Sequence, residues 1–144
     1  MGLSDAMNMP ELVKSLRLHE GDRNLPYEDE GGILTIGVGH NLERPISKAA
    51  ISQILQDDIA EAVSELNRAF KGWDSHDSAR QNVLVELMFN LGANRLKGFV
   101  NFWAAMGRKD YDAAALELLD SRWAKQVKEG RANRLAGIIR TGEI

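Results

Sequence analysis

Three side chains that could act together on one chemical bond lie close in the sequence. Glu20, Asp29 and Thr35 fall within sixteen residues, with eight residues between the two acids and five between Asp29 and the threonine. Hydrolysis of a glycosidic bond needs one carboxylic acid that protonates the leaving oxygen and a second, ionised carboxylate that aids the attack of water. A hydroxyl group can orient that water. On residue types alone the signal is weak, because acids are common near turns, and the alternative is that Glu20 is a surface residue at a helix end.

A predicted helix carries the first of these residues. Asn8 followed three residues later by Glu11 is a helix-start pattern, which is strengthened by Pro10 between them. Gly21 is a stop signal. The first helix should therefore end near Glu20.

A predicted hairpin carries the other two. Within residues 25–40, two short runs flank a Gly-Gly pair, which is typical of a β-hairpin. The second run, 33–39, is β-branched and rich in glycine, so we expect it to twist or bulge. A chain that turns back after a helix end can bring Glu20, Asp29 at the turn and Thr35 on the returning strand to one cleft.

The rest of the chain has a helical pattern. Apolar residues at three- and four-residue spacing predict a long amphipathic helix over 47–70, and a second amphipathic run ends at Gly92. The sequence therefore predicts a mostly helical α+β fold with one small sheet. Shorter helices are expected at about 98–106, 110–119, 121–128 and 132–140.

Length and composition favour one globular domain over 1–144. We expect a small lobe at about 21–50, joined by the long helix to a helical lobe made of about 1–20 and 65–144. Hydrophobic residues make up 44% of the chain and charged residues 27%, as in ordinary soluble proteins. The chain has no cysteine, which excludes disulfide scaffolds, thiolate metal sites and cysteine nucleophiles.

Other chemical motifs are weak or missing. Gly37-Val38-Gly39 lacks the third glycine and the βαβ context of a dinucleotide-binding loop. The three histidines, at positions 19, 40 and 76, are too scattered to suggest a metal cage, so no metal site is expected. No serine nucleophile elbow is present.

The charge of the chain is uneven. The net charge is −3, but residues 121–144 carry six basic and two acidic residues. A solvated helix face is the simpler interpretation, and contact with an anionic polymer such as nucleic acid or peptidoglycan is the alternative. With no apolar run that could span a bilayer and no signal pattern at the N-terminus, we expect the protein to stay in the cytoplasm where it is made.

Longer stretches around the candidate residues form a recognisable pattern. LHEG at 18–21 is followed by YED at 27–29 and by GILTIGVGH at 32–40. In order and spacing these stretches resemble the T4-type phage lysozymes, glycoside hydrolase family 24. The resemblance covers about residues 11–142, with further matching segments at 82–99, 121–123 and 131–142.

The resemblance implies a lysozyme-like fold and an N-acetylmuramidase. Such an enzyme cuts the β-1,4 bond between N-acetylmuramic acid and N-acetylglucosamine without a cofactor, and the family is known for inversion at the anomeric carbon. Glu20 would be the general acid, Asp29 would position or activate the water, and Thr35 would hold that water. In an inverting pair the two carboxyl groups should lie about 6.5–9.5 Å apart.

The resemblance also implies supporting residues. His40 and Asp58 correspond to a salt bridge that ties the hairpin to the long helix, and Arg131 corresponds to an arginine near the acid. At Phe102 and Glu117 the chain departs from the family pattern, so no substrate contact is carried over there. The residues that correspond to substrate-cleft positions are Asn41, Phe89 and Asn90.

For Phe89 and for the three tryptophans, packing in the core is the alternative to contact with the substrate. Phe89 could be a core residue instead of a substrate contact. Trp73, Trp103 and Trp123 are expected in the core rather than stacked on sugar, because they lie in helical segments.

The expected partner is the glycan strand of peptidoglycan. As a phage-type endolysin, the protein would wait in the host cytoplasm until a holin opens the membrane, and would then act on the cell wall in the periplasm. We expect a monomer with no nucleic-acid partner and no stable membrane insertion. The alternatives are a tail-associated or secreted muramidase, a non-enzymatic glycan-binding module with the same fold, and a nucleic-acid-binding protein that uses the basic tail.

Overall fold

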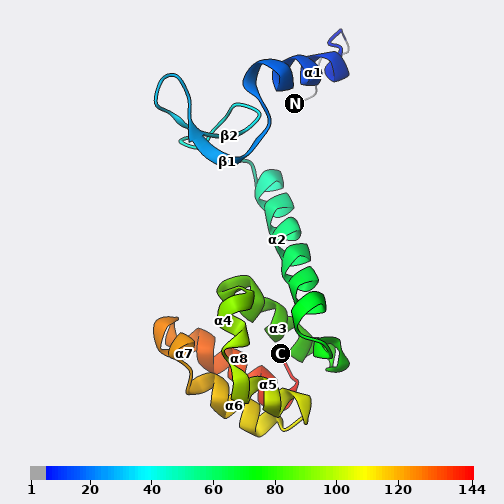
Figure 1. The fold of residues 1–144 in the computed structure, drawn as a ribbon, viewed down its shortest axis with the longest axis vertical. Helices are drawn as coiled ribbons and strands as arrows, with labels where there is room; N and C mark the ends of the chain where they lie inside the picture. Colours follow the sequence, from blue (N-terminus) through cyan, green and yellow to red (C-terminus); the bar gives the residue numbers. More distant parts are fainter. Residues whose placement is uncertain (1–5) are drawn as a thin grey trace. The chain divides into compact units, whose positions relative to one another are not determined.

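The computed structural model describes residues 6–144, apart from the side chain of Glu129. The chain divides into two compact units, Met1–Ile51 and Ser52–Ile144. Within the described residues, eight α-helices accompany one three-stranded antiparallel sheet (Figure 1). This composition confirms the mostly helical α+β class that the sequence predicts.

The first helix has the ends that the sequence predicts. In α1 (Met9–Glu20), the Asn8 side chain accepts a hydrogen bond from the backbone N–H of Glu11 at 3.2 Å. The helix ends at Gly21, whose φ of +84° is a conformation that favours glycine. None of the residues of α1 is buried.

The predicted hairpin is confirmed, and a short third strand extends it. The strands are β1 (Arg23–Glu28), β2 (Leu34–Gly37) and β3 (His40–Asn41), and they pair in the order β1-β2-β3. Both pairings are antiparallel. Residues 29–33 therefore form the turn between β1 and β2.

The expected irregularity of the hairpin lies on the other strand. Tyr27 pairs with Thr35, and Arg23 pairs with Gly37. These two pairs are four residues apart in β1 but only two residues apart in β2. The prediction of a bulge in 33–39 is thus wrong, because the extra residues belong to β1. Pro26 lies among them, and it has no N–H to donate to the ladder.

The second unit is helical throughout. The long helix α2 (Lys48–Ala69) begins just before the unit boundary and continues into this unit. The predicted helices are present, and a short extra helix, α4, was not expected. In the order of the chain the remaining elements are η1 (Trp73–Ser75), α3 (Ser78–Leu91), α4 (Ala93–Lys97), α5 (Val100–Gly107), α6 (Tyr111–Leu119), α7 (Arg122–Gln126) and α8 (Glu129–Thr141).

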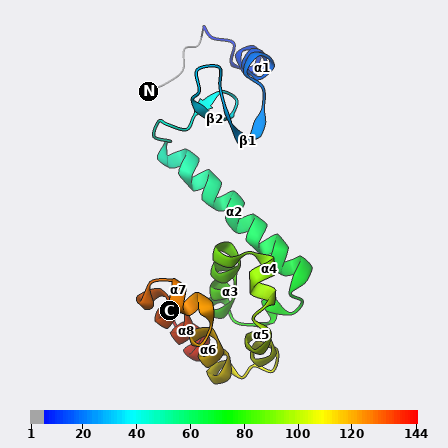
Figure 2. The same ribbon diagram turned by 60° about the vertical axis from the view of Figure 1, so that its left-hand side comes forward.

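The core of the described chain lies in the second unit. Helix α8 packs against α3 and α6 (Figure 2), and their apolar faces meet there with those of the neighbouring helices. Trp73 and Trp123 are buried, and Trp103 stacks on Phe70 with ring centroids 4.5 Å apart, as core packing predicts. The side chains at the centre, each no more than 2% exposed, include Leu66, Leu84, Leu96, Phe102, Leu135 and Ile139.

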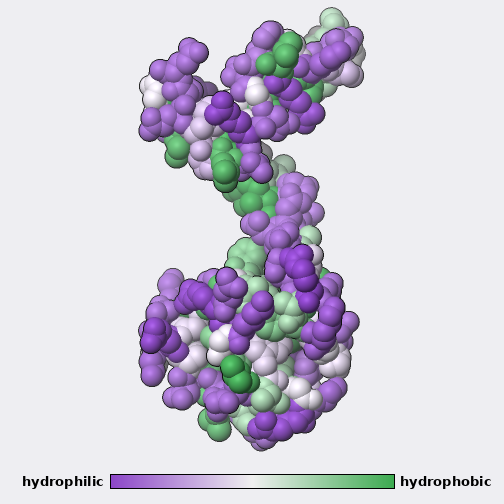
Figure 3. All heavy atoms as spheres, in the orientation of Figure 1, coloured by the Kyte–Doolittle hydropathy of each residue, from purple (hydrophilic) through white to green (hydrophobic). Residues whose placement is uncertain are grey.

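The long helix buries only part of its apolar face. Ala62 and Leu66 are its buried residues. Figure 3 shows apolar residues on the surface of α2. Ile54 and Leu55 of this helix are about half exposed. In the part of the chain that the structure describes, no helix has both the length and the hydropathy that a membrane span requires.

Candidate active site

Glu20 is the last residue of α1 and lies against the turn between β2 and β3. A Cβ atom placed on Gly39 would come within 2.9 Å of its Oε2 atom. Gly39 also has a φ of +66°, which L side chains rarely adopt. Glycine at this position therefore serves both the turn and the approach of the Glu20 side chain, and Glu20 as a whole is an exposed residue.

Asp29 begins the turn between β1 and β2, where its side chain organises the backbone. The Oδ1 atom accepts hydrogen bonds from the N–H groups of Gly31 at 2.8 Å and Ile33 at 2.9 Å. This is the turn-forming use of aspartate, in which the side chain replaces a backbone acceptor. Among the described residues no hydrogen bond is made by Oδ2, which leaves that oxygen for other use.

Thr35 is the buried member of the set, with 3% of its surface exposed. Its hydroxyl donates a hydrogen bond to the carbonyl oxygen of Ile33 at 2.8 Å. The same carbonyl accepts the backbone N–H of Asp29 at 2.9 Å. Because the hydroxyl proton of Thr35 is used, its oxygen can act only as an acceptor toward a further group.

The structure therefore places all three predicted catalytic residues in the first unit. Asp29 and Thr35 are joined through the carbonyl of Ile33, and Glu20 contacts the next turn at Gly39. Residue types and spacing alone did not single out Gly39 and Ile33. Two features of the sequence could have indicated these turns. Asp29 stands two residues before Gly31, and Gly39 directly precedes His40.

The two other predicted residues of this unit lie on β3. Asn41 pairs with Thr35 in the sheet, and its Oδ1 atom accepts the backbone N–H of Glu43 at 2.8 Å. The Asn41 amide oxygen thus holds a turn, and its NH₂ group has no partner among the described residues. His40 is exposed.

Asp58, Phe89 and Asn90 belong to the second unit. Phe89 is 47% exposed, so the alternative that it is a core residue is wrong. Asp58 and Phe89 both line a pocket of about 510 Å³. The Asn90 Oδ1 atom accepts a hydrogen bond from the indole Nε1 of Trp123 at 2.7 Å, which gives this polar side chain a protein partner.

Arg131 has an acidic partner in its own unit. Its Nε atom lies 3.1 Å from Oε2 of Glu86, which links α8 to α3. Its expected approach to Glu20 would join residues of different units, as would the expected salt bridge between His40 and Asp58. Both contacts stay predictions.

Comparison with known proteins covers the whole candidate site. The sequence profile of the phage lysozyme family matches residues 17–141. The Dictyostelium discoideum protein named probable T4-type lysozyme 2 is 25% identical over 92% of this chain and 95% of its own length. The endolysin of Salmonella phage P22 is 30% identical over 81% of this chain and 83% of its own length.

A third similar protein is much longer. The pre-baseplate central spike protein Gp5 of Enterobacteria phage T4 is 28% identical over 97% of this chain, but the match spans 29% of Gp5. The similarity to Gp5 thus concerns one part of that protein.

Proposed function

Because the chain belongs to the phage lysozyme family, and so to the lysozyme-type glycosidases, we propose that it hydrolyses the β-1,4 bond between N-acetylmuramic acid and N-acetylglucosamine in peptidoglycan. One observation carries the proposal. Two acids and a hydroxyl lie in one small unit: Asp29 and Thr35 both donate to the carbonyl oxygen of Ile33, and Glu20 lies against Gly39.

In this mechanism Glu20 is the general acid. Its protonated carboxyl group donates a proton to the glycosidic oxygen while the bond to the anomeric carbon breaks. The exposed position of Glu20 at a helix end allows an extended polymer to approach it. Gly39 lies beside the carboxylate and leaves it room, because glycine has no side chain of its own.

Asp29 and Thr35 together orient the water. The free Oδ2 of Asp29 and the hydroxyl oxygen of Thr35 are both acceptors, so each can take one hydrogen of the same water molecule. The lone pair of the water is then directed at the anomeric carbon, on the face opposite the leaving oxygen. As the new bond to the anomeric carbon forms and the bond to the leaving oxygen breaks, the Asp29 carboxylate takes the proton that the water loses. This attack inverts the anomeric centre, and it requires carboxyl groups about 6.5–9.5 Å apart.

Other residues than Glu20, Asp29 and Thr35 bind the glycan or support these three. The free NH₂ group of Asn41, the exposed ring of Phe89 and the amide of Asn90 contact the sugar chain. The proposal includes two supporting contacts that the resemblance implies. One is a salt bridge between His40 and Asp58, and the other is the approach of Arg131 to Glu20.

The proposed setting is host-cell lysis by an endolysin. The protein would act as a monomer, without a nucleic-acid partner. It would reach peptidoglycan from the host cytoplasm once a holin has permeabilised the membrane. The similarity to part of a baseplate spike protein favours one alternative, the same chemistry in a tail-associated protein. Detection of the chain in purified phage particles, rather than only in the lysate, would select that alternative.

Product analysis tests the reaction. Purified peptidoglycan digested with the protein should give fragments that end in a reducing muramic acid, as identified by mass spectrometry. A 1,6-anhydro end would overturn hydrolysis. Glu20→Gln should lower the rate at least about a thousandfold, whereas Glu30→Gln, at an exposed acid in the same unit, should leave it near wild type. Full activity of Glu20→Gln would remove the assigned acid.

A further inference from the structure

Arg23 is a cation of the first unit to which the mechanism above gives no role. It is the first residue of β1 and is exposed. Its side chain makes neither an ion pair nor a hydrogen bond with another described residue. The guanidinium instead lies over the ring of Tyr27, with its Cζ atom 4.2 Å from the ring centroid, which is the geometry of a cation–π contact.

The Arg23 side chain also lies beside the end of α1. A Cβ atom placed on Gly21 would be 3.9 Å from the Nε atom of Arg23. Gly21 directly follows Glu20, the proposed acid. The Arg23 side chain therefore extends from the residue after the acid to the Tyr27 ring.

Tyr27 connects this contact to the rest of the proposed site. It pairs directly with Thr35, and Thr35 pairs with Asn41 on its other side. Directly paired residues of an antiparallel sheet have their side chains on the same face. The Tyr27 ring is thus part of the sheet face that carries the Thr35 hydroxyl.

The stretch of backbone between Arg23 and Tyr27 is weakly held in other ways. The pairing of β1 with β2 is irregular between these two residues, and Pro26 has no N–H to donate there. In α1, which ends just before this stretch, none of the residues is buried. Neither regular strand pairing nor burial of α1 therefore fixes the end of that helix against the sheet.

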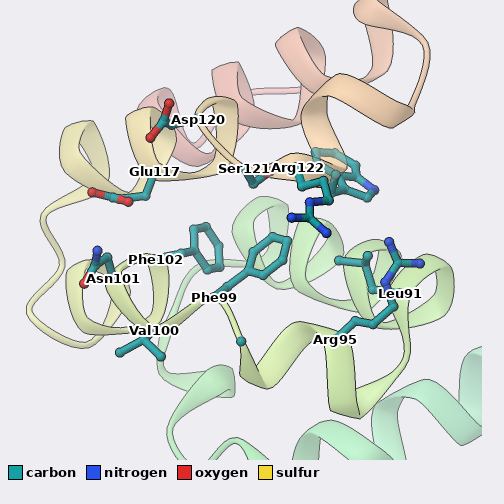
Figure 4. A pocket seen from close by; sticks show the side chains of 12 residues that line it. Leu91, Arg95, Phe99, Val100, Asn101, Phe102, Glu117, Asp120, Ser121 and Arg122 are labelled. Carbon is teal, nitrogen blue, oxygen red and sulfur yellow. The ribbon is translucent and has the colours of Figure 1, made fainter.

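A pocket of the second unit shows how charged side chains are supported where a core is present. The pocket has a volume of about 540 Å³, and the rings of Phe99 and Phe102 lie in it between Glu117 and Arg122 (Figure 4). The two rings pack edge-on with centroids 6.3 Å apart, and Phe102 is fully buried. Residues 1–51 contain a single Phe, Trp or Tyr, which is Tyr27. In the first unit, a guanidinium stacked on one ring is thus the counterpart of such ring packing.

We propose that Arg23 is a positioning residue. Through its contact with Tyr27 it fixes the end of α1, and with it the carboxyl group of Glu20, against the sheet face that carries Thr35. Arg23 itself touches neither the sugar nor the reacting atoms. The inference rests on the proposed function, because it names a residue that sets the geometry of the same site.

A double-mutant cycle tests the contact. Arg23→Gln removes the charge, whereas Tyr27→Leu removes the ring and keeps the charge. Each variant should lower kcat for purified glycan strands about fivefold at unchanged KM, because the acid is displaced and binding is not. The double variant should also lose about fivefold, rather than about twenty-fivefold, since both changes break one contact.

Two further variants show whether the effect is specific. Tyr27→Phe keeps the ring and should keep the wild-type kcat, because the hydroxyl of Tyr27 makes no hydrogen bond within the described part of the chain. Arg44→Gln is the matched control, at an exposed arginine of the same unit whose side chain has no ion pair with a described residue. It should also keep the wild-type kcat. The midpoint of thermal unfolding should stay the same in all these variants.

Three results would overturn the inference. If Arg23→Gln loses activity and Tyr27→Leu does not, the charge acts directly. If Arg23→Gln raises KM at unchanged kcat, Arg23 is a substrate contact. If the two losses multiply in the double variant, the residues act independently.

An amide signal separates this inference from the proposed function. Because the Glu20 carboxylate lies against Gly39, the Gly39 peak in proton–nitrogen correlation spectra should move in Arg23→Gln and Tyr27→Leu but not in Arg44→Gln. If the wild type cuts glycan and Arg23→Gln keeps its kcat, the inference alone fails. If the wild type cuts no glycan, the proposed function fails and the Gly39 peak decides: a shift in both variants supports the positioning role, and an unmoved peak overturns it.

Discussion

The two units maintain their structures in different ways. In the first unit, Thr35 is the only buried side chain among residues 6–51, and the turns depend on hydrogen bonds and on glycines with positive φ. In the second unit, a continuous set of apolar side chains is packed to near-zero exposure. The proposed chemistry thus lies on a hydrogen-bonded hairpin, whereas most of the burial that stabilises a fold lies elsewhere.

This difference has a consequence for mutations. A carboxylate held by two backbone N–H groups keeps its direction without a surrounding core. Substitutions in the hairpin should therefore change activity more than stability, and substitutions in the helical core should do the reverse.

Asp29→Asn should give the largest separation between activity and stability. The amide oxygen of asparagine can accept the same two N–H groups, so the turn is kept, but the negative charge that aids the water is lost. We expect the hydrolysis rate to fall by about 10²–10⁴-fold, with little change in the midpoint of thermal unfolding. Asp29→Ala, which also removes the acceptor, should lower both. A large loss of stability in Asp29→Asn would contradict the division between the units.

Leu84→Ala tests the opposite side of the comparison. Leu84 is completely buried in α3, and removing its side chain leaves a cavity. We expect a loss of about 3 kcal/mol in the free energy of unfolding, measured by urea denaturation. Activity per folded molecule should stay close to wild type. Leu116→Ala, at a leucine that is 68% exposed, is the control and should cost less than about 0.5 kcal/mol.

Gly39→Ala and Gly37→Ala form a matched pair within the hairpin. Both glycines have a φ of +66°, so both alanines should cost about 1 kcal/mol in stability. A Cβ at Gly37 would meet no atom within 4 Å, but one at Gly39 would displace the Glu20 carboxylate. We therefore expect Gly39→Ala alone to lower activity, by about tenfold or more. Equal activities of the two variants would remove the positioning role of Gly39.

Much of the fold could be predicted from local signals. The cap at Asn8, the stop at Gly21 and the Gly-Gly turn each depend on neighbouring residues, and each is confirmed. The helix α4 was missed because its five residues are too few for a periodic pattern. The glycine-rich run 33–39 favours a bulge on that strand, but the irregularity lies on β1, where Pro26 has no N–H for the ladder.

The candidate site was predicted in part, for a related reason. Glu20, Asp29 and Thr35 lie in one helix and one hairpin, whose local patterns the sequence shows, while their catalytic roles come from the resemblance and stay predictions. The bond from Trp123 to Asn90 and the ion pair between Arg131 and Glu86 join residues far apart in the sequence. No local pattern encodes such partners, because they depend on how the helices pack.

A smaller effect concerns pH and a polar network in the second unit. His76 is 7% exposed, and its Nδ1 atom lies 2.8 Å from the hydroxyl of Tyr111. The guanidinium of Arg80 lies over the Tyr111 ring, 3.6 Å from its centroid, and donates to the carbonyl oxygen of Ile139 at 2.6 Å. The network thus joins the loop before α3 to α6 and to the end of α8.

Burial lowers the pKa of His76 below its usual 6.5, and the positive charge of Lys109 lowers this pKa further. The negative charge of nearby Asp77 raises it, and the positive charge of Arg80 lowers it. The folded state therefore holds a neutral imidazole, whereas the unfolded chain takes up a proton near its usual pKa. Stability from this group is present above about pH 6.5 and is lost as the pH falls through the window below that value.

His76→Asn removes the titration while keeping a polar atom near the position of Nδ1. Between about pH 7.5 and about pH 5.5, the free energy of unfolding of the wild type should fall more than that of the variant. His19 and His40 are present in both proteins, so they do not affect the difference. If the free energies of unfolding of the two proteins change in parallel with pH, the second unit does not stabilise the neutral form of His76.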